Sequence, residues 1–97
     1  MGTIRDGGTA IASTTIAKSL WQSTILCMMA QVDITADKTN TSDVFIGSDR
    51  VNHATSPKRG TCLAPGDTQT YRDVEMNSVY IIGATVGDSV HWSGVLQ

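Results

Sequence analysis

The chain has 97 residues, of which 40% are hydrophobic and 16% are charged, and its formal net charge is −2. This length fits one domain with a small core. The only basic pair is Lys58-Arg59, which is too little positive charge for a nucleic-acid or membrane-surface footprint. The longest apolar run, residues 25–30, is far shorter than the roughly 20 residues that span a bilayer. We therefore expect neither a nucleic-acid partner nor a membrane.

The beginning of the chain is predicted to be an extended arm over residues 1–18, ahead of a folded domain over residues 19–97. Adjacent glycines weaken regular structure within residues 1–8, so this part is predicted to be flexible. Residues 9–17 are rich in Thr and Ile and are predicted to be extended. Such a segment is able to add a strand to a sheet edge, in this molecule or in a neighbour. The first residues contain no apolar signal-peptide region, so we expect synthesis in the cytoplasm.

Residues 23–33 are the strongest strand candidate. Both faces of this strand would be apolar, which is typical of a central strand or of a strand at an interface. A buried helix is the alternative, because Leu, Met and Ala are good helix formers. The short run and its strand-like neighbours favour the strand. One predicted face, assigned to the core, carries Leu26, Met28, Ala30 and Val32; the other carries Ile25, Cys27 and Met29.

Further short strands are predicted along the rest of the chain, separated by turn signals. They cover residues 43–47, 67–74, 78–84 and 89–95. Pro65-Gly66 predicts a turn, and residues 86–88 predict a hairpin turn. In the last strand Val90 and Trp92 are expected to face inward and His91 outward. Regularly spaced short strands predict an all-β fold, namely a small antiparallel β-sandwich or β-barrel with an extended N-terminal arm.

The side chains that usually carry chemistry form no recognisable constellation. His53 and His91 have no second ligand at metal-binding spacing, and the aspartates of the first polar loop do not fit an EF-hand. No serine lies in a nucleophile elbow. A disulfide between Cys27 and Cys62 is geometrically possible, although cytoplasmic synthesis disfavours it. We therefore predict no catalytic, metal or cofactor site, and no enzyme activity.

Six apolar side chains are candidates for an interface with another protein. Three belong to the predicted arm, and the others lie at or near the strand over residues 23–33. Trp21 fits a core position and an interface anchor equally well. The candidates are Ile4, Ile11, Ile16, Trp21, Cys27 and Met29.

The order of the short motifs resembles a group of small all-β structural proteins of tailed bacteriophages. In that group an Asn-Thr loop precedes a Val-Tyr-Val-Gly strand, then Leu-Ala-Pro-Gly with an acidic residue, an Ile-Tyr-Val-Ile-Gly-like strand and a final Gly-Asp turn. The match covers about residues 22–93, and Phe45 replaces the usual tyrosine. The matching segments are Asn40-Thr41, Val44-Phe45-Ile46-Gly47, Leu63-Ala64-Pro65-Gly66-Asp67, Val79-Tyr80-Ile81-Ile82-Gly83-Ala84 and Gly87-Asp88-Ser89-Val90.

The resemblance implies a virion structural role, and a free-standing chain of this size is similar to capsid decoration (cement) proteins. It implies a homotrimer on the outer capsid surface, with the major capsid protein as partner. Association would stabilise the shell by burying apolar surface. A carbohydrate-binding or adhesion module of a tail or fibre is the alternative, which exposed aromatic side chains would favour.

Overall fold

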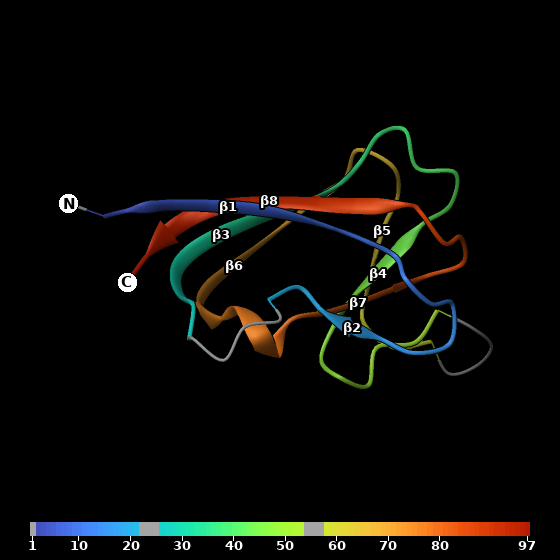
Figure 1. The fold of residues 1–97 in the computed structure, drawn as a ribbon, viewed down its shortest axis with the longest axis horizontal. Helices are drawn as coiled ribbons and strands as arrows, with labels where there is room; N and C mark the ends of the chain where they lie inside the picture. The colour runs from blue at the N-terminus through green and yellow to red at the C-terminus, as the bar shows by residue number, and fades with distance from the viewer. Residues whose placement is uncertain (1, 22–25, 54–57) are drawn as a thin grey trace.

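The computed structural model describes residues 2–21, 26–53 and 58–97. Its strands form two antiparallel four-stranded sheets, which confirms the predicted all-β class and identifies the architecture as a sandwich (Figure 1). Sheet A has the strand order β1-β8-β3-β6 and sheet B the order β2-β7-β4-β5. Among the described residues, no helix has the length and apolar character needed to cross a membrane.

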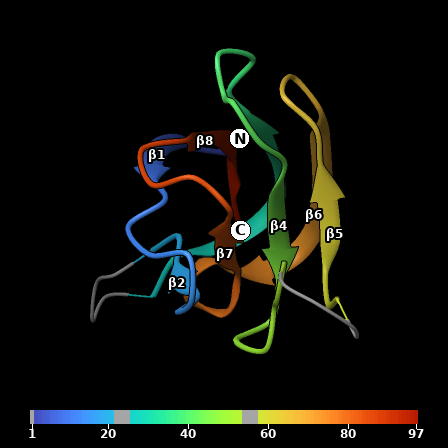
Figure 2. The same ribbon diagram turned by 90° about the vertical axis from the view of Figure 1, so that its right-hand side faces the viewer.

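The four strands of sheet A are the longer ones, and those of sheet B are short. Figure 2 views the sandwich from the end opposite the start of β1. A 3₁₀ turn, η1, precedes β7 and buries Met76 completely. In chain order the strands are β1 Ile4–Ala10, β2 Lys18–Ser19, β3 Met28–Ala36, β4 Val44–Gly47, β5 Thr61–Leu63, β6 Thr68–Glu75, β7 Tyr80–Gly83 and β8 Ser89–Leu96, with η1 at Met76–Ser78.

The core lies between the two sheets and is filled by aliphatic, methionine and tryptophan side chains. Val90 and Trp92 face inward from β8 and His91 outward, as the alternation of polarity predicted. Val44 and Ile46 face inward from β4 in the same way. The buried cluster comprises Ile11, Leu20, Cys27, Met29, Val32, Ile34, Ala36, Val44, Ile46, Leu63, Met76, Val79, Ile81, Val90 and Trp92.

Strand β3 was predicted to be a strand rather than a helix, and this is confirmed over Met28–Ala36. The predicted faces are wrong at its beginning. A register shift against β8 between Met29 and Gln31 marks a β-bulge at Ala30, and an extra residue reverses the alternation of side chains. Cys27 and Met29 therefore point into the core, whereas Leu26 and Met28 are exposed. The predicted residues 23–25 of this strand lie outside the described part of the chain.

The N-terminal segment is extended, as predicted, but it belongs to the sandwich. The strand was expected over residues 9–17 after a flexible start; it instead spans Ile4–Ala10 and pairs with β8 over seven residues. The turn at residues 86–88 forms, with Gly87 at φ 97°. It does not make a hairpin, because β7 belongs to sheet B and β8 to sheet A.

Two polar contacts fix the loops that connect the sheets. The Asp88 carboxylate accepts hydrogen bonds from the backbone N–H groups of Thr41 and Ser42, both at 3.0 Å. The Asn40 amide pairs with both backbone groups of Ser89, at 2.8 and 2.9 Å. These two contacts, which we call the polar clamp, tie the β3–β4 loop to the start of β8.

The Ala64–Asp67 turn is closed in a similar way. The Asp67 carboxylate accepts from the Ala64 N–H at 3.0 Å, and the Asp67 N–H donates to the Ala64 carbonyl at 2.9 Å. Gly66 has φ 90°, a conformation that favours glycine. Its N–H donates to the carbonyl of Ala36 at 2.8 Å, so the turn is joined to the end of β3.

Candidate interaction surface

The six candidate interface residues divide between surface and core. Ile4 on β1 and Ile16 in the following loop are 72% and 71% exposed. The other four face the interior: Ile11, Cys27 and Met29 are at most 2% exposed, and Trp21 is partly buried against the core cluster. Cys27 and Met29 were candidates for packing between subunits if the outer face of their strand was apolar; in this structure both lie in the core cluster. Ile11 is likewise a core residue.

Trp21 lies at the edge of the core. Its ring meets that of Trp92 edge to face, with the centroids 6.1 Å apart, and the Arg5 guanidinium lies 5.6 Å from its centroid. An aromatic pair in this geometry contributes about 0.5–1.5 kcal/mol beyond its area burial. Trp21 was predicted to be either a core residue or an interface anchor, and these contacts support the core position.

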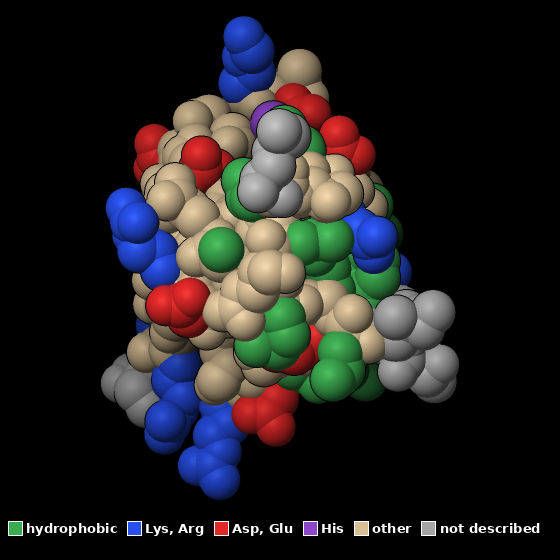
Figure 3. Space-filling model, turned by 90° about the vertical axis from the view of Figure 1, so that its left-hand side faces the viewer, with side chains coloured by type: hydrophobic (Ala, Val, Ile, Leu, Met, Phe, Trp, Pro, Cys, Tyr) green, Lys and Arg blue, Asp and Glu red, His purple; other side chains and the backbone are tan. Residues whose placement is uncertain are grey.

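An exposed apolar patch lies at the end of the sandwich where β1 begins and β8 ends. We call it the end patch and define it as Ile4, Leu26, Met28 and Val95, which are exposed by 72%, 68%, 37% and 38%; Leu26 is included because it precedes Met28 by two residues in the chain. Ile4 and Val95 are directly paired across β1 and β8, and the Gln97 N–H donates to the Met28 carbonyl at 3.1 Å. Figure 3 faces this end and shows hydrophobic side chains gathered on part of it. Sequence reasoning found only Ile4.

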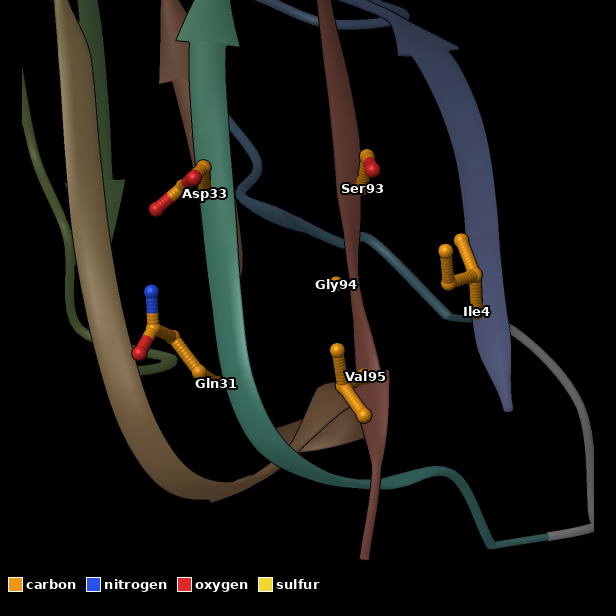
Figure 4. A pocket seen from close by; sticks show the side chains of 6 residues that line it. All are labelled: Ile4, Gln31, Asp33, Ser93, Gly94 and Val95. Carbon is orange, nitrogen blue, oxygen red and sulfur yellow. The ribbon is translucent and has the colours of Figure 1, made fainter. Parts of the chain in front are cut away.

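A shallow depression of about 300 Å³ adjoins the end patch on the outer face of sheet A. Figure 4 shows Ile4 and Val95 on one side of it and Gln31 and Asp33 on β3 on the other. Asp33 accepts a hydrogen bond from Thr70 on β6 at 2.6 Å. The depression therefore offers aliphatic contact beside polar groups and does not enclose a ligand. Its lining residues are Ile4, Gln31, Asp33, Ser93, Gly94 and Val95.

Strand β1 is a long edge strand with few of the usual edge-blocking features, although Arg5 is a charged residue at an inward position on it. The edges of sheet B, β2 and β5, have two and three residues, and short edge strands resist unwanted pairing. Strand β6, the other edge of sheet A, contains Asp73 with φ 51°, which disturbs regular pairing. Strand β1 has seven residues without Pro, Lys or a bulge. This open edge, with the end patch beside it, is the candidate interaction surface.

The two cysteines are free thiols in different surroundings, so the disulfide left open by the sequence does not form in this structure. Cys27 is buried, and burial is the main cause that raises its pKa. Cys62 is exposed on β5 and donates to the Asp43 carboxylate at 3.2 Å. Desolvation and this hydrogen bond raise the pKa of Cys62 above its ordinary value.

Alkylation of Cys62 should be slower at pH 8 than that of an unperturbed thiol, because the thiolate is the reactive form and a raised pKa reduces its fraction. Replacing Asp43 with asparagine removes a negative charge beside the sulfur and should accelerate alkylation severalfold. The rate of iodoacetamide modification, followed by mass spectrometry from pH 7 to 10, measures this. The Cys62→Ser chain is the control, and its buried Cys27 should not react. Equal rates for the parent chain and Asp43→Asn would contradict the assigned role of Asp43.

Titratable side chains form no metal centre in the described part of the chain, where no group of three or more His, Cys, Asp or Glu residues is placed to hold an ion. His53 Nε2 lies 2.6 Å from the Thr14 carbonyl and joins two loops. Asp37 accepts from the backbone N–H and the hydroxyl of Thr39, which lowers the pKa of its carboxyl group. Asp37 and His91 border a second shallow depression, of about 340 Å³. These contacts support loop structure.

Comparison with known proteins finds no family model that matches the chain and no curated protein that matches it in sequence.

Proposed function

We propose that the chain is a virion structural protein of a tailed bacteriophage, which decorates the outside of the capsid and clamps neighbouring capsid subunits. The observation that carries the proposal is the open edge of β1 beside the end patch. An edge strand recruits a partner strand through backbone hydrogen bonds, and adjacent apolar side chains add affinity. The order of motifs that resembles phage structural proteins points to the major capsid protein as the partner and to a homotrimer as the bound form.

The alternative, a carbohydrate-binding module of a tail or fibre, has less support. Such a module needs exposed aromatic rings on which sugars stack. Trp92 is buried, and Trp21 and Tyr71 pack against the core. The depression beside Gln31 and Asp33 is the feature that favours this second function. Binding to a glycan array is its test.

The location of the protein on purified virions tests the proposal directly. Gold-tagged antibody should label the heads in electron micrographs. Label confined to tails or fibres would favour the adhesion module, and label on no particle would refute a virion role.

Loss of the end patch should weaken binding to purified capsids. Burying Ile4 and Leu26 is worth up to about 1.5–3 kcal/mol each, and 1.4 kcal/mol is a tenfold change in affinity. The double variant Ile4→Ser/Leu26→Ser should therefore bind about tenfold more weakly. Cosedimentation with shells over a range of protein concentrations measures the dissociation constant.

The matched control is Ile16→Ser/Val86→Ser, which removes two comparably exposed apolar side chains, 71% and 62%, outside the end patch. Its affinity should equal that of the parent chain. Equal affinities for both double variants would remove the end patch from the binding surface.

A further inference from the structure

Strand β1 contributes little apolar surface to the core. Its inward positions carry Arg5, Gly7 and Thr9, all only partly buried, whereas the intervening residues are exposed. Its neighbour β8 instead buries Val90 and Trp92. Because apolar burial is the dominant favourable term in folding, β1 is held mainly by its backbone pairing with β8. Segments with few buried apolar contacts open at lower free energy than the core.

Two side chains beside β1, those of Trp92 and Trp21, suit particular residues of β1. A Cβ atom at Gly7 would lie 3.0 Å from Cε2 and Cζ2 of Trp92, so a larger residue here would require the indole ring to shift by a few tenths of an ångström, and glycine fits without that shift. Two residues earlier, the Arg5 guanidinium covers the ring of Trp21 at 5.6 Å. An incoming strand with glycine facing Trp92 and a cation facing Trp21 would restore both contacts. A second copy of this chain carries that strand.

The residue that follows β1, Ile11, is held firmly in the core. Ile11 is 2% exposed, its N–H donates to the Asp88 carbonyl at 2.6 Å, and its carbonyl accepts from the Gly87 N–H at 3.0 Å. The chain therefore connects β1 to the core only at the C-terminal end of the strand, through Ile11. Seven residues of extended chain span about 23 Å, enough to reach across to a neighbouring molecule.

We propose that β1 exchanges between copies of this chain, so that the β1 strand of one molecule pairs with β8 of another in the register seen here. Apart from the contacts next to the fixed Ile11, the contacts of β1 are reproduced by the exchange, which makes swapping a low-cost route to association. The main free-energy cost of exchange is the entropy lost when two molecules associate. The fraction of exchanged molecules therefore rises with protein concentration. The edge strand thereby acts as a link between identical subunits. This inference does not depend on binding to a capsid.

A disulfide placed between β1 and β8 records which molecule supplied the strand. Ile4 and Val95 are directly opposite on the exposed face, and opposite Cβ atoms in a sheet lie close enough for a disulfide. The variant Ile4→Cys/Val95→Cys, with Cys62→Ser, is incubated reduced over about three orders of magnitude in concentration, then diluted and oxidised. Non-reducing electrophoresis should show covalently linked chains whose fraction rises with the incubation concentration.

The control pair is Asp33→Cys/Ser93→Cys, which are opposite residues of β3 and β8, two strands that do not exchange. It should give only monomer at every concentration. The proposal would be overturned if the β1–β8 cysteine pair gave only monomer on the gel. It would also be overturned if both cysteine pairs gave the same fraction of covalently linked chains. If Ile4→Cys/Val95→Cys does not oxidise, Asp6→Cys/Ser93→Cys takes its place, because Asp6 and Ser93 are also directly opposite.

Discussion

Replacing Gly94 with valine should destabilise the fold by more than about 3 kcal/mol, beyond the usual cost of overpacking. A Cβ atom at this position would meet the carbonyl oxygen of Gln31 and would lie 2.8 Å from Cα of Val32 and from Cε of Met29. Two of these atoms belong to the backbone of β3 beside the bulge, so they cannot move without shifting the central pair of strands. In a domain of this size the melting temperature should fall by more than about 12 °C. Thermal unfolding followed by circular dichroism measures it.

Gly8→Val on β1 is the matched control. Gly8 is exposed, and the nearest atoms to a Cβ there are the Val90 carbonyl oxygen at 3.5 Å and Cβ of His91 at 4.0 Å, which are ordinary contacts. Valine also favours strands. This variant should keep the parent melting temperature or slightly exceed it. A Gly94→Val chain as stable as Gly8→Val would contradict the close packing of β8 against β3.

The parts of the fold that followed from the sequence are those set by local alternation of polarity. Val90 and Trp92 flank the polar His91, and Val44 and Ile46 are likewise separated by one residue, the apolar Phe45. A strand has a side-chain period of two, so each pair had to share a face. The turn at Pro65-Gly66 followed from backbone restriction at proline and freedom at glycine.

The features that the sequence did not reveal depend on contacts between distant strands. The bulge at Ala30 is a shift in the register of β3 against β8, whereas the register against β6 continues across it, and alanine gives no local sign of it. It reverses the inward and outward residues that precede it, which is why Cys27 was named an interface candidate and Met28 was assigned to the core face. Similarly, the turn chemistry at residues 86–88 identifies a turn but does not say that the next strand joins the other sheet.

The candidate surface was only partly predictable for the same reason. Ile4 is an isolated aliphatic residue in a polar segment, and it was named an interface candidate. Met28 and Val95 join it only because β1, β8 and β3 lie next to one another in sheet A. Strand order of this kind is a non-local property. The open edge of β1 became visible only once that order was known.

The motifs that carry the resemblance to phage structural proteins have structural roles here. Asn40, Thr41 and Asp88 form the polar clamp, and Ala64 to Asp67 close the turn against β3. Because these residues hold loops and turns in place, their pattern bears on the architecture and not on the choice of a partner. Under the proposed function, residues outside the motifs, notably Ile4 and Leu26, make the contact with the partner. Capsid binding by the end-patch variants is consequently the more specific test of function.

The polar clamp itself should be a major source of stability, and Asp88→Ala should lower the free energy of unfolding by about 2–4 kcal/mol. Asp88 is 7% exposed, and its carboxylate accepts from two backbone N–H groups and, at 3.3 Å, from the Thr41 hydroxyl. Alanine would leave partly buried donors without their acceptor. Asp88→Asn keeps one acceptor oxygen and should lose roughly half as much. Urea denaturation followed by tryptophan fluorescence measures both variants.

Asp49→Ala serves as the control for the loss of one aspartate, because Asp49 is exposed and surface substitutions usually change stability by less than about 0.5 kcal/mol. The expected order of stability is therefore parent, Asp49→Ala, Asp88→Asn and Asp88→Ala. An Asp88→Ala chain as stable as Asp49→Ala would show that the two connecting loops hold their positions without the carboxylate. In that case the pairing of Asn40 with Ser89, together with burial of Val90 one residue later, would be sufficient to fix the start of β8.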